Sequence, residues 1–192
     1  MEIILASGSP RRQDILNLFP VEFKTQVSNI NEDVDIDDPY ILVEKLSFDK
    51  AMDVAVNNPD SIVIGADTIV YLDGVILGKP KSKEEAFDML KSLSGRRHEV
   101  ITGISIVIGN KKIQLKDHET TGVFFKYLSD EEVLSYIETG EPFDKAGSYG
   151  IQGIGSIFID KIEGCYFNVV GLPTNKLYNL LGRIGVNLLE RK

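Results

Sequence analysis

The sequence predicts an α/β fold in which a mixed β-sheet is flanked by helices. Segments with strand and helix patterns alternate along the chain, as they do in proteins whose parallel strands are joined by helical crossovers. Two pairs of neighbouring strand patterns are instead joined by short turn signals, Asp73-Gly74 and Gly109-Asn110, which are typical of hairpins. Crossovers and hairpins together require parallel and antiparallel pairs in one sheet.

Runs of Ile, Val and Leu predict the strands. Residues 2–6 form a short apolar run that ends at Ser-Gly-Ser-Pro. Residues 61–71 are almost continuously apolar, as expected for a central strand that is buried on both faces. The expected strands are residues 2–6, 61–71, 75–77, 99–108, 112–125, 156–162 and 166–170.

Helix start signals precede the apolar stripes of helical period. Pro10 and Pro39 suit the first helical position behind the N-cap residues Ser9 and Asp38, and Pro173 opens the last helix. The Ser-x-x-Glu spacing at residues 82–85 and 129–132 marks two capping boxes. The expected helices are residues 10–19, 38–56, 82–93, 129–137 and 173–181.

The composition excludes several classes of protein. Of the 192 residues, 43% are hydrophobic and 26% are charged, which is too apolar for a disordered tail. No apolar run reaches the roughly 18 residues that span a bilayer, and residues 1–5 lack the basic start of a secretory signal. One cysteine and two histidines do not suit a disulfide framework or a Cys/His zinc cage. We therefore expect a cytoplasmic globular protein without a membrane partner.

The net charge of -8 argues against a nucleic-acid polymer as partner, because contacts to phosphates dominate such binding. A local cationic cluster can still hold one small anion. Ser7, Gly8 and Ser9 place small residues and hydroxyls before a helix, and Arg11 and Arg12 add bidentate donors for phosphate. The alternative is an ordinary capped helix with solvated arginines, and the glycine spacing is not that of a P-loop.

Two acidic positions are candidates for binding a cation. Asp67 lies in an apolar run, where a carboxylate is costly to bury unless it is paired or binds a cation. Glu32 lies in the acidic run 31–35. If Glu32 met Asp67, the pair would suit Mg²⁺ or Mn²⁺ together with a substrate phosphate. The alternatives are a strand register that turns Asp67 to solvent, a structural ion pair, and a solvated loop around Glu32.

Two loops carry further candidates. Pro80 restrains the backbone before it and could aim Lys79 inward, although most loop lysines are solvated. The glycine-rich segment 146–155 is too punctuated for regular structure and indicates a binding loop. Within it, the Gln152 amide has donors and acceptors that could read a base edge, and the alternative is a structural loop. We expect His98 and Cys165 to be packing residues.

Six segments follow one another along the chain: Leu5-Ala6-Ser7-x-Ser9-Pro10-Arg11-Arg12, Ile64-Gly65-Ala66-Asp67-Thr68, Leu77-Gly78-Lys79-Pro80, Leu-Ser-Gly-Arg-x-His-x-Val-x-Thr-Gly at 93–103, Asp-Lys-Ala-Gly-x-Tyr-Gly-Ile-Gln-Gly at 144–153, and Val170-Gly171-Leu172-Pro173. Their shared order resembles the Maf family of nucleotide pyrophosphatases, and the resemblance covers nearly the whole chain. The resemblance implies a single domain over residues 1–192 with an inosine-triphosphatase-like fold. Such a fold has a mixed, twisted sheet and two lobes around a deep cleft.

The resemblance also implies an activity. A nucleoside triphosphate would be hydrolysed to the monophosphate and pyrophosphate with a divalent cation, Mg²⁺ or Mn²⁺. The Tyr-Gly-Ile-Gln segment resembles the branch that acts on dTTP and UTP, whereas a sister branch with Glu in place of Gln is directed at 7-methyl-GTP. The implied role is the removal of non-canonical or excess pyrimidine nucleotides. A nucleotide-binding regulator of septum formation is the alternative, and only the resemblance suggests a homodimer.

Four individual roles follow from the same resemblance, and the others follow from the residue types discussed above. Asp67 corresponds to the proton acceptor, and Arg12, Thr68 and Gln152 correspond to residues tied to substrate choice. The expected substrate-binding residues are Ser7, Ser9, Arg11, Arg12, Lys50, Thr68, Lys79 and Gln152. The expected metal-binding residues are Glu32 and Asp67. One carboxylate cannot freely bind a metal and accept a proton, so the division of Asp67 between these two roles stays open.

Overall fold

The computed structural model describes residues 1–190, and its sheet is mixed, as predicted. Its strands lie in the order β2 (Phe23–Thr25), β1 (Ile3–Leu5), β3 (Ile62–Leu72), β5 (Arg97–Ile108), β6 (Ile113–Phe125) and β7 (Ile159–Glu163), and β4 (Val75–Leu77) pairs with β3. β1 is parallel to both β2 and β3, whereas the β3–β4 and β6–β7 pairs are antiparallel. In the described part of the chain, no helix is long and apolar enough to cross a bilayer.

The described chain divides into two compact units. The first contains residues 1–67 and 102–119 and the chain from Gly171 onward. The second contains residues 68–101 and 120–170. β3, β5 and β6 contribute residues to both units, because each of these strands extends past a unit boundary.

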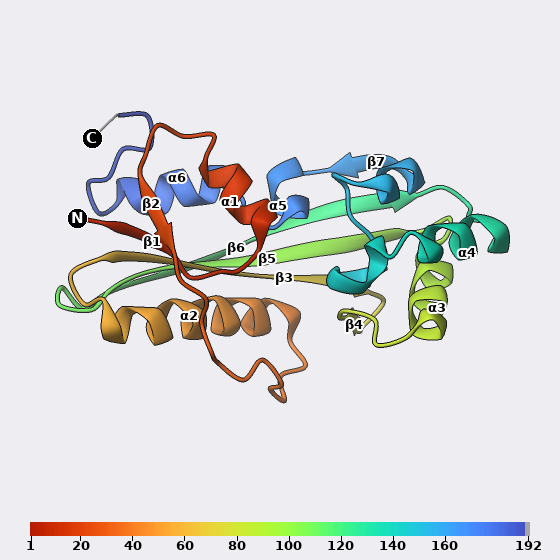
Figure 1. Ribbon diagram of the computed structural model, residues 1–192, viewed down its shortest axis with the longest axis horizontal. Coiled ribbons are helices and arrows are strands. Elements are labelled where there is room, and N and C mark those ends of the chain that lie inside the picture. The colour runs from red at the N-terminus through yellow and green to blue at the C-terminus, as the bar shows by residue number, and fades with distance from the viewer. Residues whose placement is uncertain (191–192) are drawn as a thin grey trace. The chain divides into compact units, whose positions relative to one another are not determined.

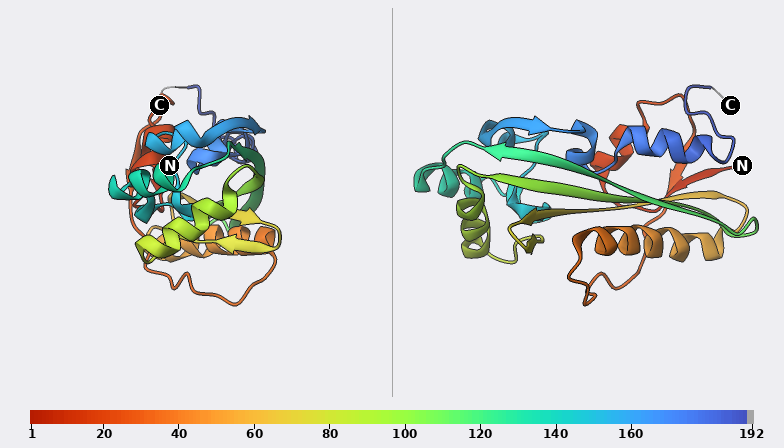
Figure 2. Two further views of the ribbon diagram at one scale, coloured as in Figure 1. Left: turned by 90° about the vertical axis from the view of Figure 1, so that its right-hand side faces the viewer. Right: turned by 180° about the vertical axis from the view of Figure 1, so that it is seen from behind.

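In the first unit, helices cover both faces of the sheet (Figure 1 and Figure 2). α2 (Pro39–Asn57) lies on one face, and α1 (Pro10–Leu16) and α6 (Thr174–Gly182) lie on the other. Asp38 caps α2 as predicted, since its Oδ1 accepts hydrogen bonds from the backbone N–H groups of Tyr40 and Ile41. Buried residues of α2, β1, β3 and β5, together with Ala6 just after β1, form one apolar cluster: Ile4, Ala6, Ala51, Val54, Ala55, Val63 and Val107.

Gly65 brings the backbones of β3 and α2 unusually close. A Cβ atom at this position would overlap the carbonyl oxygen of Ser47 and would also meet Ala51. Ser47 is itself fully buried, and its Oγ lies 2.9 Å from Oγ of Ser105, so the helix is also tied to β5. The absent side chain therefore sets the distance between the helix that carries Lys50 and the strand that carries Asp67.

In the second unit, α3 (Lys83–Leu93) contacts α4 (Asp130–Glu138), and both begin behind their predicted N-cap serines. The reciprocal capping box forms at α4, whereas at α3 the Glu85 Oε2 accepts from the Lys81 N–H instead of from Ser82. The Ser82 Oγ accepts from the Glu85 N–H, and Ser129 and Glu132 cap each other's backbone reciprocally. The unit also contains α5 (Tyr166–Val170) and the 3₁₀ helices η1 (Glu141–Asp144), η2 (Ala146–Ser148) and η3 (Ile154–Phe158). Its core contains aliphatic and aromatic residues of β3, β5, β6, α3, α4 and η3 and of the segments between elements: Val70, Leu72, Ala86, Leu90, Leu93, Val100, Val123, Phe125, Leu128, Val133, Tyr136, Ile137, Tyr149 and Phe158.

Several element predictions were wrong. Residues 166–170 form helix α5 instead of a strand, because Asn168 is buried and its Nδ2 donates to the Val100 carbonyl at 2.9 Å and to the Thr121 Oγ1 at 3.0 Å. These tertiary hydrogen bonds outweigh the strand propensity of the neighbouring Tyr, Phe and Val residues. Residues 156–158 belong to η3, and the strand begins only at Ile159. α1 ends at Leu16 instead of at Phe19. The three-residue strand β2 was not predicted, because it is too short and too exposed to show a pattern.

His98 lies in the core of the second unit. It is 1% exposed, its Nε2 lies 2.7 Å from the Tyr149 hydroxyl, and its ring contacts that of Phe125 edge to face. Within the described residues its Nδ1 has no hydrogen-bond partner. Burial, and secondarily the positive charge of Arg97, lower the pKa of His98 to about 3. The imidazole is therefore neutral in the folded protein at ordinary pH.

This burial predicts a pH dependence of stability. In the unfolded chain His98 takes up a proton near its ordinary pKa of about 6.5, whereas the folded protein resists protonation until about pH 3. The unfolded state therefore binds more protons between these values, and the free energy of unfolding falls as the pH is lowered below about 6.5. Between about pH 7.5 and about pH 5 the His98 contribution to this loss is about 2 kcal/mol.

Denaturant unfolding of the wild type and of His98→Gln across this range measures the effect. Glutamine does not titrate, so the variant should lose about 2 kcal/mol less than the wild type between the two pH values. The carboxylates Glu132, Glu141 and Glu163, whose pKa values are also lowered in the folded protein, are present in both proteins and cancel in the difference. Parallel curves for the two proteins would contradict the assignment.

Candidate active site

A buried lysine in the first unit joins the two carboxylates that the sequence singles out. Nζ of Lys50, on α2, lies 2.6 Å from the Asp67 Oδ1 and 2.9 Å from the Glu32 Oε1. The side chains of Lys50 and Asp67 are 9% and 10% exposed, whereas that of Glu32 is 56% exposed. The structure thus brings Glu32 and Asp67 to one centre, and the group between them is an ammonium.

Two features hold the segment that carries Glu32. Its backbone is anchored where the Asn29 N–H donates to the Asp53 Oδ2, on α2, at 2.9 Å. Further along, the Asn31 Oδ1 accepts from the Asp33 N–H at 3.0 Å, which forms a local turn around Glu32. Asp53 was not among the predicted site residues, because a single half-buried carboxylate on a helix gives no sequence signal for this contact.

Arg12 is fixed from two sides. Its Nε donates to the carbonyl oxygen of Gly171 at 2.8 Å, and its Nη1 donates to the Oγ of Ser7 at 3.2 Å. Ser7 is buried, and its Oγ also accepts from the Ser9 N–H at 3.2 Å. Gly171 has a φ of 121°, a backbone conformation that favours glycine. In the sequence, the motif Val170-Gly171-Leu172-Pro173 was the feature that drew attention to this residue.

The charges around Arg12 include those of the carboxylate centre. Burial lowers the pKa of the Arg12 guanidinium, Asp67 raises it, Arg11 lowers it and Glu32 raises it. A guanidinium stays protonated in spite of such shifts. Arg11, Arg12, Glu32 and Asp67 are therefore electrostatic neighbours, and the first unit brings together three of the predicted cations with both predicted carboxylates.

The start of α1 agrees with the sequence only in part. Pro10 is the first helical residue and Ser9 occupies the N-cap position, as predicted. Within the part of the chain that the structure describes, however, the Ser9 side chain makes no capping hydrogen bond. The buried hydroxyl of Ser7 is the one that organises this turn, since it contacts both Ser9 and Arg12.

The two carboxylates that contact Lys50 fit a divalent cation that takes its remaining ligands from water and substrate. Among the described residues, no three His, Cys, Asp or Glu side chains gather into a complete protein cage. Mg²⁺ commonly binds to one or two carboxylates and takes its other ligands from water and substrate phosphates. Glu32 and Asp67, already drawn to a single positive charge, match this mode. That they hold a metal remains a prediction.

The remaining predicted residues belong to the second unit. Thr68 follows Asp67 in β3 and is half-buried, whereas Lys79 and Gln152 are exposed. The segments of Lys79 and Gln152 are connected, because the Gly147 N–H donates to the Gly78 carbonyl oxygen at 3.0 Å. The structure brings these two predicted loops together, and it places them in a different unit from Lys50 and Arg12.

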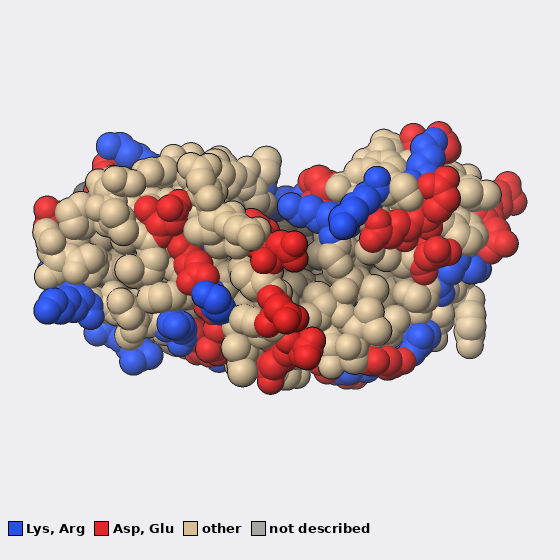
Figure 3. Space-filling view, turned by 90° about the horizontal axis from the view of Figure 1, so that it is seen from below, with Lys and Arg blue, Asp and Glu red and all other residues tan. Residues whose placement is uncertain are grey.

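On the face drawn in Figure 3, acidic and basic side chains are interspersed. The charges around Lys50 are thus a local group, not part of a large surface patch of one sign on this face.

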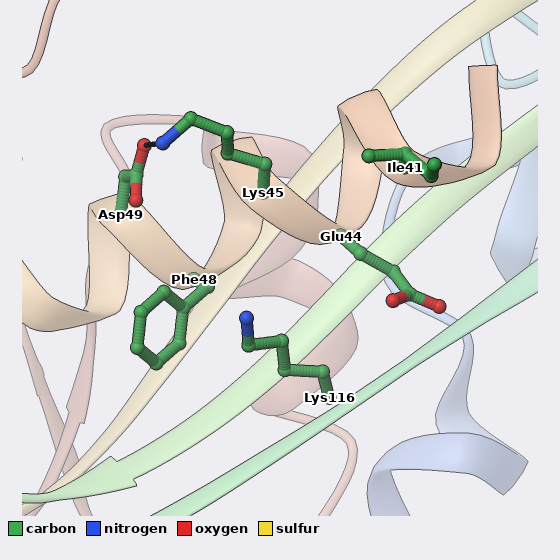
Figure 4. A pocket seen from close by; sticks show the side chains of 6 residues that line it. All are labelled: Ile41, Glu44, Lys45, Phe48, Asp49 and Lys116. Atoms are coloured by element: carbon green, nitrogen blue, oxygen red, sulfur yellow. Dashed lines mark hydrogen bonds and ion pairs between the residues drawn. The ribbon is translucent and has the colours of Figure 1, made fainter. Parts of the chain in front are cut away.

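A separate hollow lies between α2 and β6 (Figure 4). The Lys116 ammonium lies 4.0 Å from the centre of the Phe48 ring, and Lys45 pairs with Asp49 at 2.6 Å. The residues that line the hollow are Ile41, Glu44, Lys45, Phe48, Asp49 and Lys116. None of them is a predicted site residue, so the hollow is distinct from the carboxylate centre.

Comparison with known proteins decides the family. The family model described as "Maf-like protein" matches residues 2–184. This chain belongs to the Maf family. Its relatives include a protein of Ruminiclostridium cellulolyticum, 48% identical over 98% of each chain, and one of Thermosipho africanus, 51% identical over 94% of this chain and 92% of the relative. A protein of Caldicellulosiruptor saccharolyticus is 45% identical over 98% of each chain, and all three relatives are named dTTP/UTP pyrophosphatase.

A solved structure supports the predicted fold of this Maf protein. The Staphylococcus aureus Ham1 protein aligns with a TM-score of 0.50 at 19% sequence identity, covering 83% of this chain and 80% of the other. At this identity the likeness concerns the fold alone. It agrees with the inosine-triphosphatase-like fold, a mixed sheet flanked by helices, that the sequence predicts.

Proposed function

We propose that this Maf protein hydrolyses dTTP and UTP to the monophosphate and pyrophosphate. The observation that carries the proposal is the ionic centre formed by Lys50, Asp67 and Glu32 beside Arg11 and Arg12. Positive side chains next to carboxylates suit a triphosphate, because its hydrolysis depends on neutralising charge and on positioning a water molecule. The names of relatives that are 45% to 51% identical over nearly the full chain supply the substrates.

Each cation has a distinct task in this proposal. Arg12 is oriented through Ser7 and Gly171, so its planar guanidinium is held in a defined direction for a phosphate. An ammonium has three N–H donors, and Lys50 directs two of them to Asp67 and Glu32. The third donor of Lys50 would then go to a phosphate oxygen. Arg11 adds a second guanidinium beside Arg12 for the triphosphate. The role of Lys79 in substrate binding stays a prediction from the sequence.

Asp67 carries the proton transfer in the proposal. The Asp67 carboxylate is 10% exposed and is held by Lys50, so its orientation is fixed. In the proposal it accepts the proton of the attacking water molecule. Glu32 and Asp67 would hold Mg²⁺ or Mn²⁺, and such an ion would neutralise charge at the phosphates. Gln152 and Thr68 select the base, with the Gln152 amide bonded to the pyrimidine edge.

A panel of nucleotides tests the proposal. Purified protein with Mg²⁺ or Mn²⁺ is incubated with dTTP, UTP, dCTP, dATP, GTP and 7-methyl-GTP, and release of pyrophosphate is measured. We expect dTTP and UTP to have the highest kcat/KM, with pyrophosphate and the monophosphate formed in equal amounts. Release of single phosphates would contradict cleavage between the α and β phosphates. Binding without turnover of any nucleotide would favour a regulator instead.

The proposal extends to the setting of the enzyme. We expect it to act in the cytoplasm on free nucleotides, not on a nucleic acid or at a membrane. Light scattering in solution distinguishes the expected homodimer from a monomer.

A further inference from the structure

Glu141, the first residue of η1, holds the loop that follows it in the sequence. Its Oε2 accepts a hydrogen bond from the backbone N–H of Ile154 at 2.8 Å. Its Oε1 accepts from the N–H of Gly155 at 3.1 Å and from the Tyr136 hydroxyl at 3.0 Å. One side chain thus ties α4 to the C-terminal end of the glycine-rich segment.

The glycines of this segment fit around the same carboxylate. A Cβ atom at Gly153 would overlap the Glu141 Oε1, and one at Gly155 would lie 2.7 Å from the Tyr136 hydroxyl. The other end of the segment is held too, because Lys145 donates to the Glu141 carbonyl oxygen at 2.8 Å and its side chain crowds Gly150. Residues 150–155 therefore lie against Glu141 at both ends of the turn.

Glu141 remains charged in this environment. Burial raises the pKa of its carboxyl group, but the hydrogen bonds from the N–H groups of Gly155 and Ile154 and from Tyr136 lower the pKa more, and the net shift is downward. A carboxylate only accepts hydrogen bonds, so in each of its hydrogen bonds with the loop the backbone N–H group is the donor. Hydrogen bonds to an ionised acceptor are also stronger than neutral ones.

We propose that Glu141 is a positioning residue that fixes the Gln152 turn for base selection. The inference rests on the proposed function, in which Gln152 reads the pyrimidine. Gln152 is exposed and lies between Gly150 and Gly153, both of which contact the Glu141 region, so its direction follows from the backbone around it. An amide discriminates between bases only if its donor and acceptor are held in place, because a mobile one adapts to either edge.

The sharpest comparison is between dTTP and dCTP, whose bases present opposite donor and acceptor patterns at neighbouring positions. Glu141→Gln keeps the shape of the side chain and removes the charge, and one of its terminal atoms becomes a donor facing a backbone N–H. We expect the ratio of kcat/KM for dTTP to that for dCTP to fall about 10-fold. Glu131→Gln, an exposed position on α4, removes the same charge and should leave the ratio within about 2-fold of wild type.

Two further variants separate positioning from a general loss of structure. Gly153→Ala forces a methyl group against the Glu141 carboxylate without changing any charge, and it should lower the ratio to a similar extent. In a Gln152→Ala background the ratio is already low, and adding Glu141→Gln should change it by less than about 2-fold. Hydrogen exchange of the Ile154 and Gly155 amides should be slow in the wild type and fast in Glu141→Gln.

The outcomes distinguish the inference from the proposed function. A wild type that hydrolyses neither dTTP nor UTP overturns the proposed function and the inference with it. A wild type that discriminates, together with a Glu141→Gln variant of unchanged ratio, overturns the inference alone. The inference is also overturned if Glu141→Gln lowers the dTTP/dCTP ratio of kcat/KM about 10-fold in the Gln152→Ala background. Fast hydrogen exchange of the Ile154 and Gly155 amides in the wild type overturns it as well.

Discussion

Replacing Asp67 by asparagine should lower kcat for dTTP by about 10²-fold to 10⁴-fold, the usual contribution of a positioned proton acceptor. Asparagine has nearly the same size, and its oxygen can still accept from Lys50, so the ion pair becomes a hydrogen bond and the fold is retained. The amide cannot take a proton from water at neutral pH. Steady-state kinetics give kcat, and equilibrium titration of a non-hydrolysable dTTP analogue shows whether binding persists.

The matched control for this variant is Asp88→Asn. Asp88 is an exposed aspartate on α3, and its replacement should leave kcat within about 2-fold of wild type. An Asp67→Asn protein with full activity would remove Asp67 from its proposed role. A variant that loses nucleotide binding completely would instead assign Asp67 to ligand binding.

Replacing Lys50 by methionine should lower the free energy of unfolding by about 3 kcal/mol at neutral pH. Methionine fills most of the space of the lysine stem, but it leaves the Asp67 carboxylate, 10% exposed, without its cation. The Glu32 side chain is 56% exposed and is solvated in either protein, so it adds little. Denaturant unfolding, with the midpoint and slope both reported, measures the change.

The double variant Lys50→Met/Asp67→Asn tests the cause. Removing both charges leaves no unpaired buried ion, so the double variant should regain most of the lost stability. Lys45→Met on the same helix is the control, because the Lys45–Asp49 pair is exposed and its loss should cost less than about 1 kcal/mol. Equal losses at Lys45 and Lys50 would show that burial of the pair has no energetic consequence.

The elements that the sequence predicts well are those with local signals. Capping residues place the starts of α2, α3 and α4, since Asp38, Ser82 and Ser129 make the hydrogen bonds that their positions imply. The errors occur where distant residues decide the conformation. Asn168 is held inward by Val100 and Thr121, and no pattern within residues 166–170 contains that information.

The candidate site shows the same division. Asp67 could be identified from its own surroundings, because an acidic residue in an apolar run requires a partner. Its partner Lys50 could not be identified in this way, because Lys50 lies on another element and the ion pair depends on how α2 packs against β3. Asp53 and Glu141, whose carboxylates accept from backbone N–H groups, were missed because each resembles an ordinary surface residue in the sequence.

The contact at Gly65 has a consequence for how this protein can change. Any replacement there adds at least one carbon atom, and that atom would wedge the helix of Lys50 away from the strand of Asp67. The Lys50 Nζ and the Asp67 Oδ1 lie 2.6 Å apart, so a shift of the helix away from the strand would break their ion pair. A single methyl group, remote from water and carrying no charge, would thus act as a mutation of both charged residues at once. The hydrogen atom that stands in place of a side chain at Gly65 is therefore what allows Lys50 and Asp67 to meet.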